Sequence, residues 1–436
     1  MRLALTPLTV AGATAAMLLT GTPPVAVAAT PGHVRSHPPA APAGDPVVAW
    51  NRTLLGVLRT PGAQPTTVHA TRSLAIVHAA IYDAAVANDR RWTPYLAAER
   101  APRHASVSAA INAAAHSSLI ALYPALRPQL DDEYARALAL IPGGMRRNQG
   151  IRIGEHAAAR ILAQRADDGS SATPPPFTPG SQPGDYQPTP PAFAAPVFTH
   201  WAAVTPFALE RADQFRPPPP PALPSRAYAD ALNEVKRLGV AQGSTRTPDQ
   251  TQIAQFWAGP IWIAWNEIAD TAALTKPRPV AATARTFALL NLSLADGATA
   301  MYDAKYAVRL WRPVTAIQHA DADGNPATAP DPTWTSFQTT PPDPAYPGAH
   351  SVESGAAATV LTTAYGKALP FTASSDVLPG TERRFDGFSA AAHEAGLSRI
   401  FAGVHTSLDD RAGQRLGASL ATYIDHRFLL PRHGRR

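Results

Sequence analysis

Apolar residues recur every three to four positions through most of the chain, which is the spacing of one face of an α-helix. Proline and glycine interrupt these runs at short intervals, so the pattern predicts many separate helices. The first group is expected over residues 73–88, 105–122, 130–140 and 148–165. The second group is expected over residues 226–238, 247–258, 262–271, 280–309, 351–365, 388–403 and 409–427. We find no convincing series of alternating strands, and the fold class predicted is all-α.

Two further stretches differ from the helical pattern. Residues 169–225 are dense in proline, which excludes continuous helix and favours extended segments. This stretch also carries aromatic residues that a solvated linker would not need, so we favour an arm that packs on the protein. Its five large aromatics are Phe193, Phe198, Trp201, Phe207 and Phe215. Residues 318–346 form a long irregular stretch, and loops of that length are often functional.

The expected organisation is two helical bundles of the four-helix type, joined by the Pro-rich arm. The N-terminal bundle is placed at residues 47–168, the arm at 169–225 and the C-terminal bundle at 226–430. A weak internal repeat supports this division, because Ala80–Ala84 resembles Ala300–Ala304. Chance matches of five residues are common in Ala-rich helices, so the repeat is weak evidence for two bundles.

The N-terminus has the features of a secretory signal peptide, predicted at residues 1–29. Arg2 is followed by an apolar run from Leu3 to Leu19, and small residues precede a cleavage point near Ala28 or Ala29. A membrane anchor is the alternative, but threonine and glycine interrupt the run and its length is marginal for a span. We therefore expect a secreted protein.

The residues that follow the signal peptide carry no second candidate span. Residues 30–46 are rich in proline and alanine and are predicted to be disordered. The longest later apolar stretch, Phe256 to Trp265, is far shorter than the roughly 20 residues that a membrane helix needs. No membrane span is expected in the mature chain.

Composition narrows the chemistry that the chain can perform. The 436 residues include no cysteine, which excludes disulfide scaffolds, Cys-ligated zinc, iron–sulfur clusters and thiol catalysis. The formal net charge is +6, yet only four of the 38 basic residues are lysine. No dense basic run with interleaved aromatics occurs, so nucleic-acid binding is not expected.

A lysine and an arginine stand seven residues apart in the motif Lys305-x6-Arg312-Pro313. If one helix carries both, this spacing puts them on the same face, and Pro313 then helps to end that helix. Two converging cations suit a multiply charged oxyanion. The alternative is a solvated basic face, which Arg309 between them would fit.

A second motif, Pro347-Gly348-Ala349-His350, immediately precedes the helix expected over 351–365. Small residues before a helix let backbone N–H groups approach an anion closely. His350 could donate or accept a proton there. The alternative is an ordinary junction between a loop and a helix.

The third motif is Ser398-Arg399-x5-His405-x3-Asp409. If His405 and Asp409 share a helix, their spacing stacks them on one face, and the carboxylate can hold the imidazole in one tautomer. The other ring nitrogen is then free to bond a metal or to attack phosphorus. The alternative is a surface Asp–His pair of little consequence.

Together the three motifs resemble a signature shared by vanadium-dependent haloperoxidases and the type 2 phosphatidic acid phosphatase superfamily, which includes bacterial nonspecific acid phosphatases. That signature is Lys-x6-Arg-Pro, then Pro-Ser-Gly-His, then Ser-Arg-x5-His-x3-Asp, and it matches from Lys305 to Asp409. The flanking helices and the stretch Leu162–Gly169 look more like the secreted bacterial haloperoxidases than the small phosphatases. The chain departs at Gly348, which lacks the serine hydroxyl that family members use to hydrogen-bond the oxyanion.

The resemblance implies vanadate as the cofactor, in a site that phosphate can also occupy. His405 would be the metal ligand, and the implied catalytic residues are His350, His405 and Asp409. The implied oxyanion-binding residues are Lys305, Arg312, Gly348, Ala349 and Arg399, the two small residues acting through their backbone N–H groups.

The implied activity is oxidation of a halide by hydrogen peroxide to hypohalous acid equivalents. The implied partners are hydrogen peroxide, halide and a small organic acceptor, with a homodimer as one expected assembly. The alternative is a secreted acid phosphatase, in which His405 attacks phosphorus to form a phosphohistidine and His350 protonates the leaving alcohol.

Overall fold

The computed structural model describes residues 44–64, 68–89, 91–96 and 101–432. The predicted signal peptide and most of the predicted disordered segment lie outside these residues. The prediction that disorder extends to residue 46 was wrong at its end, because a helix already begins at Pro46, with Asp45 as its N-cap. Within the described residues no single helix is long and apolar enough to cross a membrane, although Val107–Leu122 and Pro124–Ala139, bent by 119°, pass that test as a pair.

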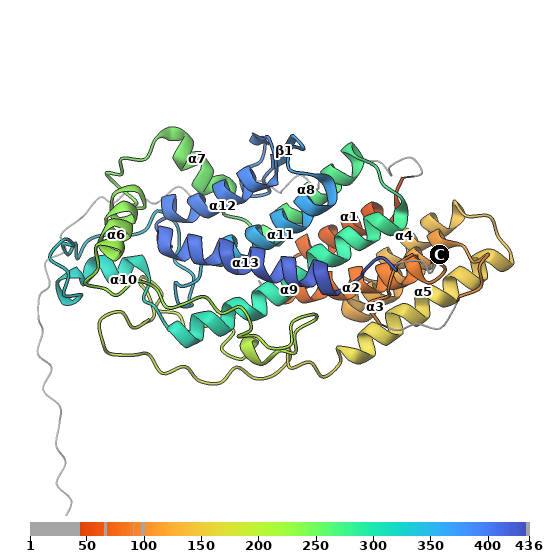
Figure 1. The fold of residues 1–436 in the computed structure, drawn as a ribbon, viewed down its shortest axis with the longest axis horizontal. Helices are drawn as coiled ribbons and strands as arrows, with labels where there is room; N and C mark the ends of the chain where they lie inside the picture. The colour runs from red at the N-terminus through yellow and green to blue at the C-terminus, as the bar shows by residue number, and fades with distance from the viewer. Residues whose placement is uncertain (1–43, 65–67, 90, 97–100, 433–436) are drawn as a thin grey trace, which may run out of the picture. The chain divides into compact units, whose positions relative to one another are not determined.

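The described residues are mostly helical, which confirms the all-α class (Figure 1). The first helices are α1 Pro46–Arg59, α2 His69–Val86, α3 Val107–Leu122, α4 Arg127–Ala139 and α5 Met145–Gln164. The later ones are α6 Arg226–Leu238, α7 Pro248–Phe256, α8 Ile261–Thr275, α9 Val280–Val308, α10 Pro313–Gln318, α11 Ala349–Tyr365, α12 Phe388–Phe401 and α13 Ser407–Arg427. An antiparallel pair of short strands, β1 Phe371–Ser374 and β2 Glu382–Phe385, was not predicted.

Helix α9 is the central element, and it is buried along most of its 29 residues. Helices α2, α11 and α13 all pack against it, and Figure 1 shows it crossing between α13 and α2. Helix α2 belongs to the predicted N-terminal bundle and α9 to the predicted C-terminal one. The described residues form one compact unit, so the boundary between two bundles stays a prediction.

Helices α11 and α13 approach each other closely because glycines line their contact. A Cβ added at Gly417 would lie 1.9 Å from the carbonyl oxygen of Val352, and one added at Gly413 would lie 2.7 Å from that of Gly348. Such distances leave no room for a side chain. The close approach places residues Pro347–His350, which span the start of α11, against the first turns of α13.

The Pro-rich arm packs on α9, as predicted. The buried carboxylate of Asp296 accepts hydrogen bonds from the backbone N–H groups of Phe207, Ala208 and Leu209, at 2.6–2.8 Å. Of the five aromatics on which this prediction rested, Trp201 and Phe207 are buried, whereas Phe193 is 64% exposed. Three bonds to one carboxylate therefore hold the arm in addition to the buried aromatic side chains.

Candidate active site

Lys305 and Arg312 come together, but not on one helix face as predicted. Helix α9 ends at Val308, and Arg309 adopts a left-handed conformation with φ 57°, which turns the chain. Arg312 is then the N-cap of α10, and Pro313 begins that helix rather than ending α9, because proline is well suited to a first helical position. A turn in the chain, not helical periodicity, brings the two cations side by side.

A carboxylate that the sequence analysis missed joins these cations. Asp343 Oδ1 lies 3.0 Å from Lys305 Nζ and also accepts from Arg312 Nη2, while Arg312 Nε donates to the Asp343 carbonyl at 2.7 Å. Lys305 Nζ donates as well to the carbonyl oxygens of Pro344 and Ala345. All three charged side chains are buried. The only sequence signal for Asp343 was its place in the long irregular stretch 318–346.

His405 lies outside α13, contrary to the expectation that it stacks with Asp409 on one helical face. Thr406 is the N-cap of α13, and Thr406 and Asp409 form a capping box. The Thr406 N–H donates to Asp409 Oδ2 at 2.6 Å, and the same oxygen lies 3.4 Å from His405 Nδ1. Cap geometry therefore brings the carboxylate to the imidazole.

The contacts of His405 determine its tautomer. Arg312 Nη1 lies 3.1 Å from His405 Nε2, and because a guanidinium can only donate, Nε2 is the acceptor. The ring proton therefore sits on Nδ1, facing Asp409. Burial, followed by the charge of Arg312, holds the pKa of His405 well below its usual value. A neutral imidazole whose lone pair is on Nε2 is the form that binds a metal, once Arg312 gives up its bond to that nitrogen.

Arg399 adds a third buried cation from the last turn of α12. Its Nη1 donates to Gln338 Oε1 at 3.1 Å, and its Nε has no hydrogen-bond partner. Burial, with a smaller contribution from Arg312, lowers the pKa of Arg399 to about 10, so it remains charged at neutral pH. The Arg399 carbonyl accepts from the backbone N–H groups of Val404 and His405, which fixes the turn between α12 and His405.

The loop that leads into α11 offers fewer backbone donors than predicted. The Gly348 N–H is already bonded to the Asp409 carbonyl at 3.0 Å. The Ala349 N–H remains, because the first residue of a helix has no intrahelical acceptor. The bond from Gly348 instead ties the loop to α13.

His350 follows as the second residue of α11. Its Nε2 lies 3.0 Å from the Trp257 carbonyl, which can only accept, so Nε2 carries the proton and Nδ1 is the basic nitrogen. Burial, followed by Arg399, lowers the pKa of His350 to about 3. The same imidazole perturbs His405, which places both histidines in one electrostatic cluster.

The cluster carries buried positive charge in excess. Lys305, Arg312 and Arg399 face Asp343 and Asp409, and burial raises the pKa of Asp409 even though the Thr406 N–H opposes this. Buried charge of one sign is costly unless it is compensated, and an oxyanion is the kind of ligand that would compensate these cations. The described residues contain no group of three or more His, Asp or Glu that could hold a metal cation.

The comparisons with known proteins point to one group of enzymes. Residues 285–429 match a family model described as the VCPO second helical-bundle domain. A solved bacterial vanadium-dependent iodoperoxidase aligns over 91% of this chain and 99% of its own, with a TM-score of 0.77 and 26% identity. The family model covers the C-terminal part of the chain and the iodoperoxidase most of it, so the chain is similar to the vanadium-dependent haloperoxidases. It is therefore an enzyme of the peroxidase class.

Two solved chloroperoxidase structures are more distant in sequence. The holo-type bacterial vanadium-dependent chloroperoxidase covers 87% of this chain and 96% of its own at a TM-score of 0.68 and 17% identity. The apo-type chloroperoxidase structure covers 83% of this chain and 94% of its own, with a TM-score of 0.65 and 16% identity. These two show the shared fold. No curated protein matched the sequence.

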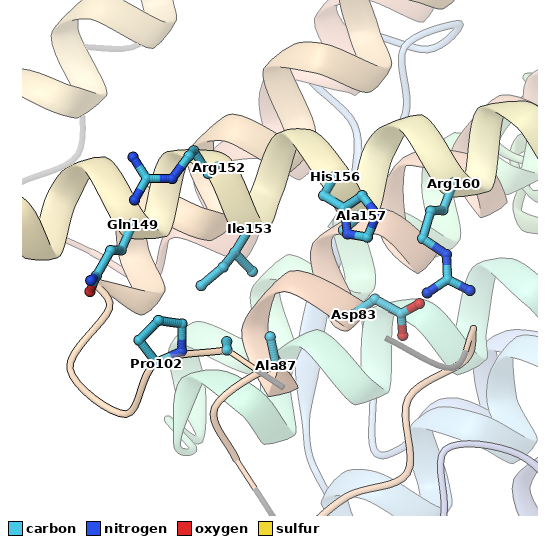
Figure 2. Close-up of a pocket in the computed structure, with 10 residues that line it drawn as sticks. Asp83, Ala87, Pro102, Gln149, Arg152, Ile153, His156, Ala157 and Arg160 are labelled. Carbon is cyan, nitrogen blue, oxygen red and sulfur yellow. The ribbon is translucent and has the colours of Figure 1, made fainter. Parts of the chain in front are cut away.

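A separate cavity of about 280 Å³ lies between α2 and α5, away from the haloperoxidase motifs. Figure 2 shows Ile153 and Arg160 of α5 pointing toward Asp83 of α2 and Ala87, which follows the end of that helix. None of the predicted site residues lines this cavity. The family's motifs instead meet where α9, α11, α12 and α13 converge, in the cluster described above.

Proposed function

We propose that this haloperoxidase holds vanadate against His405 and uses hydrogen peroxide to oxidise a halide to hypohalous acid equivalents. The observation that carries the proposal is the unprotonated Nε2 of His405, which accepts from Arg312 within a buried excess of positive charge. A bound vanadate would supply a Lewis-acid centre that activates peroxide, and the vanadium would keep its oxidation state. Phosphate, a tetrahedral anion of the same kind, can occupy the same site.

The side chains have distinct roles in this proposal. His405 Nε2 is the single metal ligand, and Asp409 faces its protonated Nδ1. Lys305, Arg312 and Arg399 neutralise the oxyanion, and the unpartnered Arg399 Nε is a donor with no competing acceptor. The Ala349 N–H at the start of α11 adds a backbone donor with the favourable end of a helix dipole.

His350 is the acid–base group of the proposal. Its low pKa keeps it neutral near pH 7, so its first act is to accept a proton from incoming hydrogen peroxide at Nδ1. Its Nε2–H bond to the Trp257 carbonyl stabilises the imidazolium that results. The proton can then be returned to the oxygen that leaves as water.

The second candidate function is the acid phosphatase. The observation that favours it is the same unprotonated His405 Nε2, which three cations surround and which could attack phosphorus directly. The missing hydroxyl at Gly348 removes a donor that the haloperoxidase reaction uses in other family members. One cluster thus supports either reaction.

A paired assay separates the two functions. Purified protein is given orthovanadate, hydrogen peroxide and bromide, and dye bromination is followed beside a phosphate-ester assay without vanadate. The proposal predicts bromination that needs vanadate and that disappears in His405→Ala. His393→Ala is the control and should keep the activity, because His393 is exposed and outside the cluster. Ester hydrolysis that vanadate blocks, without bromination, would instead establish the phosphatase.

We also propose that the chain is exported and cleaved near Ala28 or Ala29. Support comes from the basic start and the apolar run of the first residues. N-terminal sequencing of the protein from culture medium tests this, and an intact Met1 in a cell-retained product would contradict it.

A further inference from the structure

Asp343 is a buried charged group that the proposed reaction does not use. Its Oδ1 is shared by the Lys305 ammonium and the Arg312 guanidinium, and Tyr302 Oη lies 3.4 Å from its Oδ2. It lies four residues before the Pro347–His350 loop. The carboxylate therefore sits among the cations that would neutralise an oxyanion.

Asp343 carries a full negative charge in this position. Burial alone would raise its pKa, but Lys305 and Arg312 outweigh burial and hold that pKa below the usual value for aspartate. Asp343 thus cancels one of the three cationic charges of the cluster. Charges in a dry interior act on one another strongly and are poorly screened by salt.

We infer that Asp343 sets the charge of the oxyanion site, so that doubly charged tetrahedral oxyanions are disfavoured relative to singly charged ones. This inference rests on the proposed function, because it requires that the cluster bind an oxyanion. A fixed negative charge repels a dianion with twice the energy with which it repels a monoanion at the same place. Asp343 is a specificity-determining residue in this account.

A purely structural role predicts a different result. If Asp343 only holds Lys305 and Arg312 in place, its loss disturbs the donors for every tetrahedral anion alike. Singly and doubly charged anions would then lose affinity by the same factor. The ratio of the two affinities therefore distinguishes charge setting from positioning.

Perrhenate and tungstate are suitable probes, because in dilute solution at neutral pH, where Lys305 is still charged, they are tetrahedral oxyanions of single and double charge. Calorimetric titration of the full chain gives both dissociation constants. In Asp343→Asn we expect the tungstate-to-perrhenate affinity ratio to rise on the order of tenfold. Asp168→Asn is the matched control, since Asp168 is buried and paired with Arg72 and Arg165, and its ratio should not change.

A double variant tests the charge itself. Lys305→Met combined with Asp343→Asn removes one positive and one negative charge, so the ratio should return to within about twofold of the wild-type value. If Asp343 had no electrostatic effect, the double variant would instead lose affinity for tungstate preferentially. Thermal unfolding shows whether Asp343→Asn is folded. If it is not, the double variant alone tests the charge-setting role.

The outcomes are distinct. An unchanged ratio in folded Asp343→Asn, or equal weakening for both anions, overturns the charge-setting role and leaves the proposed function intact. If folded wild-type protein binds perrhenate, tungstate and orthovanadate not at all, the proposed function fails together with this inference.

Discussion

At the scale of single residues, the site depends on long side chains that reach one another from separate segments. Lys305 comes from α9, Arg312 from the start of α10 and Arg399 from the end of α12. They surround His405, whose tautomer Arg312 determines. Each of these contacts is buried, so a change of one atom in the cluster should have a measurable effect.

Gly348→Ser should increase haloperoxidase activity. A Cβ at Gly348 would lie 3.3 Å from Ser351 Oγ and 3.5 Å from the Asp409 carbonyl, so a serine fits with a small adjustment. The new hydroxyl adds one hydrogen bond to the oxyanion, which corresponds to a rise of about three- to tenfold in kcat/KM for bromide. Gly348→Ala is the control, because it adds the Cβ without the hydroxyl. Equal behaviour of the two variants would contradict the prediction.

Perrhenate affinity should depend on pH through Lys305. Burial lowers the pKa of this ammonium to about 8, although Asp343 opposes the shift. A bound anion favours the charged form, so affinity is constant below that pKa and falls above it, by up to about tenfold per pH unit. Calorimetric titrations on both sides of pH 8 measure this. Flat affinity across the range in wild type, indistinguishable from Lys305→Met, would refute the role of Lys305.

At the scale of elements, the close contact of α11 with α13 sets the distance between the two histidine-bearing segments. Glycines at the contact let the two backbones approach, and the Gly348 N–H bond to Asp409 joins the helix starts. His350 and His405 keep their relative positions only while this contact is preserved.

Gly417→Ala should separate α11 from α13. Its Cβ would lie 1.9 Å from the Val352 carbonyl and 2.7 Å from the Ala356 nitrogen, which are backbone atoms that cannot move aside. We expect a loss of about 1–3 kcal/mol in the free energy of unfolding, measured in urea, with reduced activity. Gly56→Ala is the matched control in α1, where a Cβ meets nothing within 4 Å, and a helical alanine should stabilise by about 0.4–1 kcal/mol. Similar effects in both variants would argue against the close contact.

Most helices could be predicted from the sequence, because periodicity and Pro/Gly breakers are local signals, but α1 and α10 were not among the predicted ranges. Residues 226–238 were placed without error, and the other predicted helices mostly differ by a few residues at their ends. The site was only partly predictable. The left-handed Arg309 and the capping box at Thr406 changed how the motif residues meet, and Asp343 acquires its role only through contacts made across the fold. The strands β1 and β2 are too short for alternation to be recognised.

At the scale of the whole molecule, the arm of residues 169–225 joins segments that are distant in sequence. Asp296 on α9 anchors its later part through three backbone N–H groups. Arg216 pairs with Asp303 further along the same helix. The arm therefore packs along the helix that ends in the site, and its attachment contributes to the position of Lys305.

Asp296→Asn should loosen the arm. Burial raises the pKa of Asp296 to about 6, against the effect of the three N–H donors, so the group is a carboxylate at neutral pH. Replacing it removes charge-assisted hydrogen bonds at a cost of about 1.5–3 kcal/mol, and limited proteolysis should then cut within residues 169–225. Asp303→Asn breaks a more exposed ion pair and should cost at most about 1 kcal/mol. Resistance to proteolysis equal to wild type would contradict the anchoring role.

The central claim is that His405 Nε2 is the vanadium ligand, and X-ray absorption at the vanadium edge tests it most directly. Wild-type protein with one equivalent of orthovanadate should show a single nitrogen among oxygen neighbours, and that nitrogen should be absent from His405→Ala and present in His393→Ala. A vanadium environment of oxygen alone in wild-type protein, or a nitrogen neighbour that survives in His405→Ala, would contradict the account.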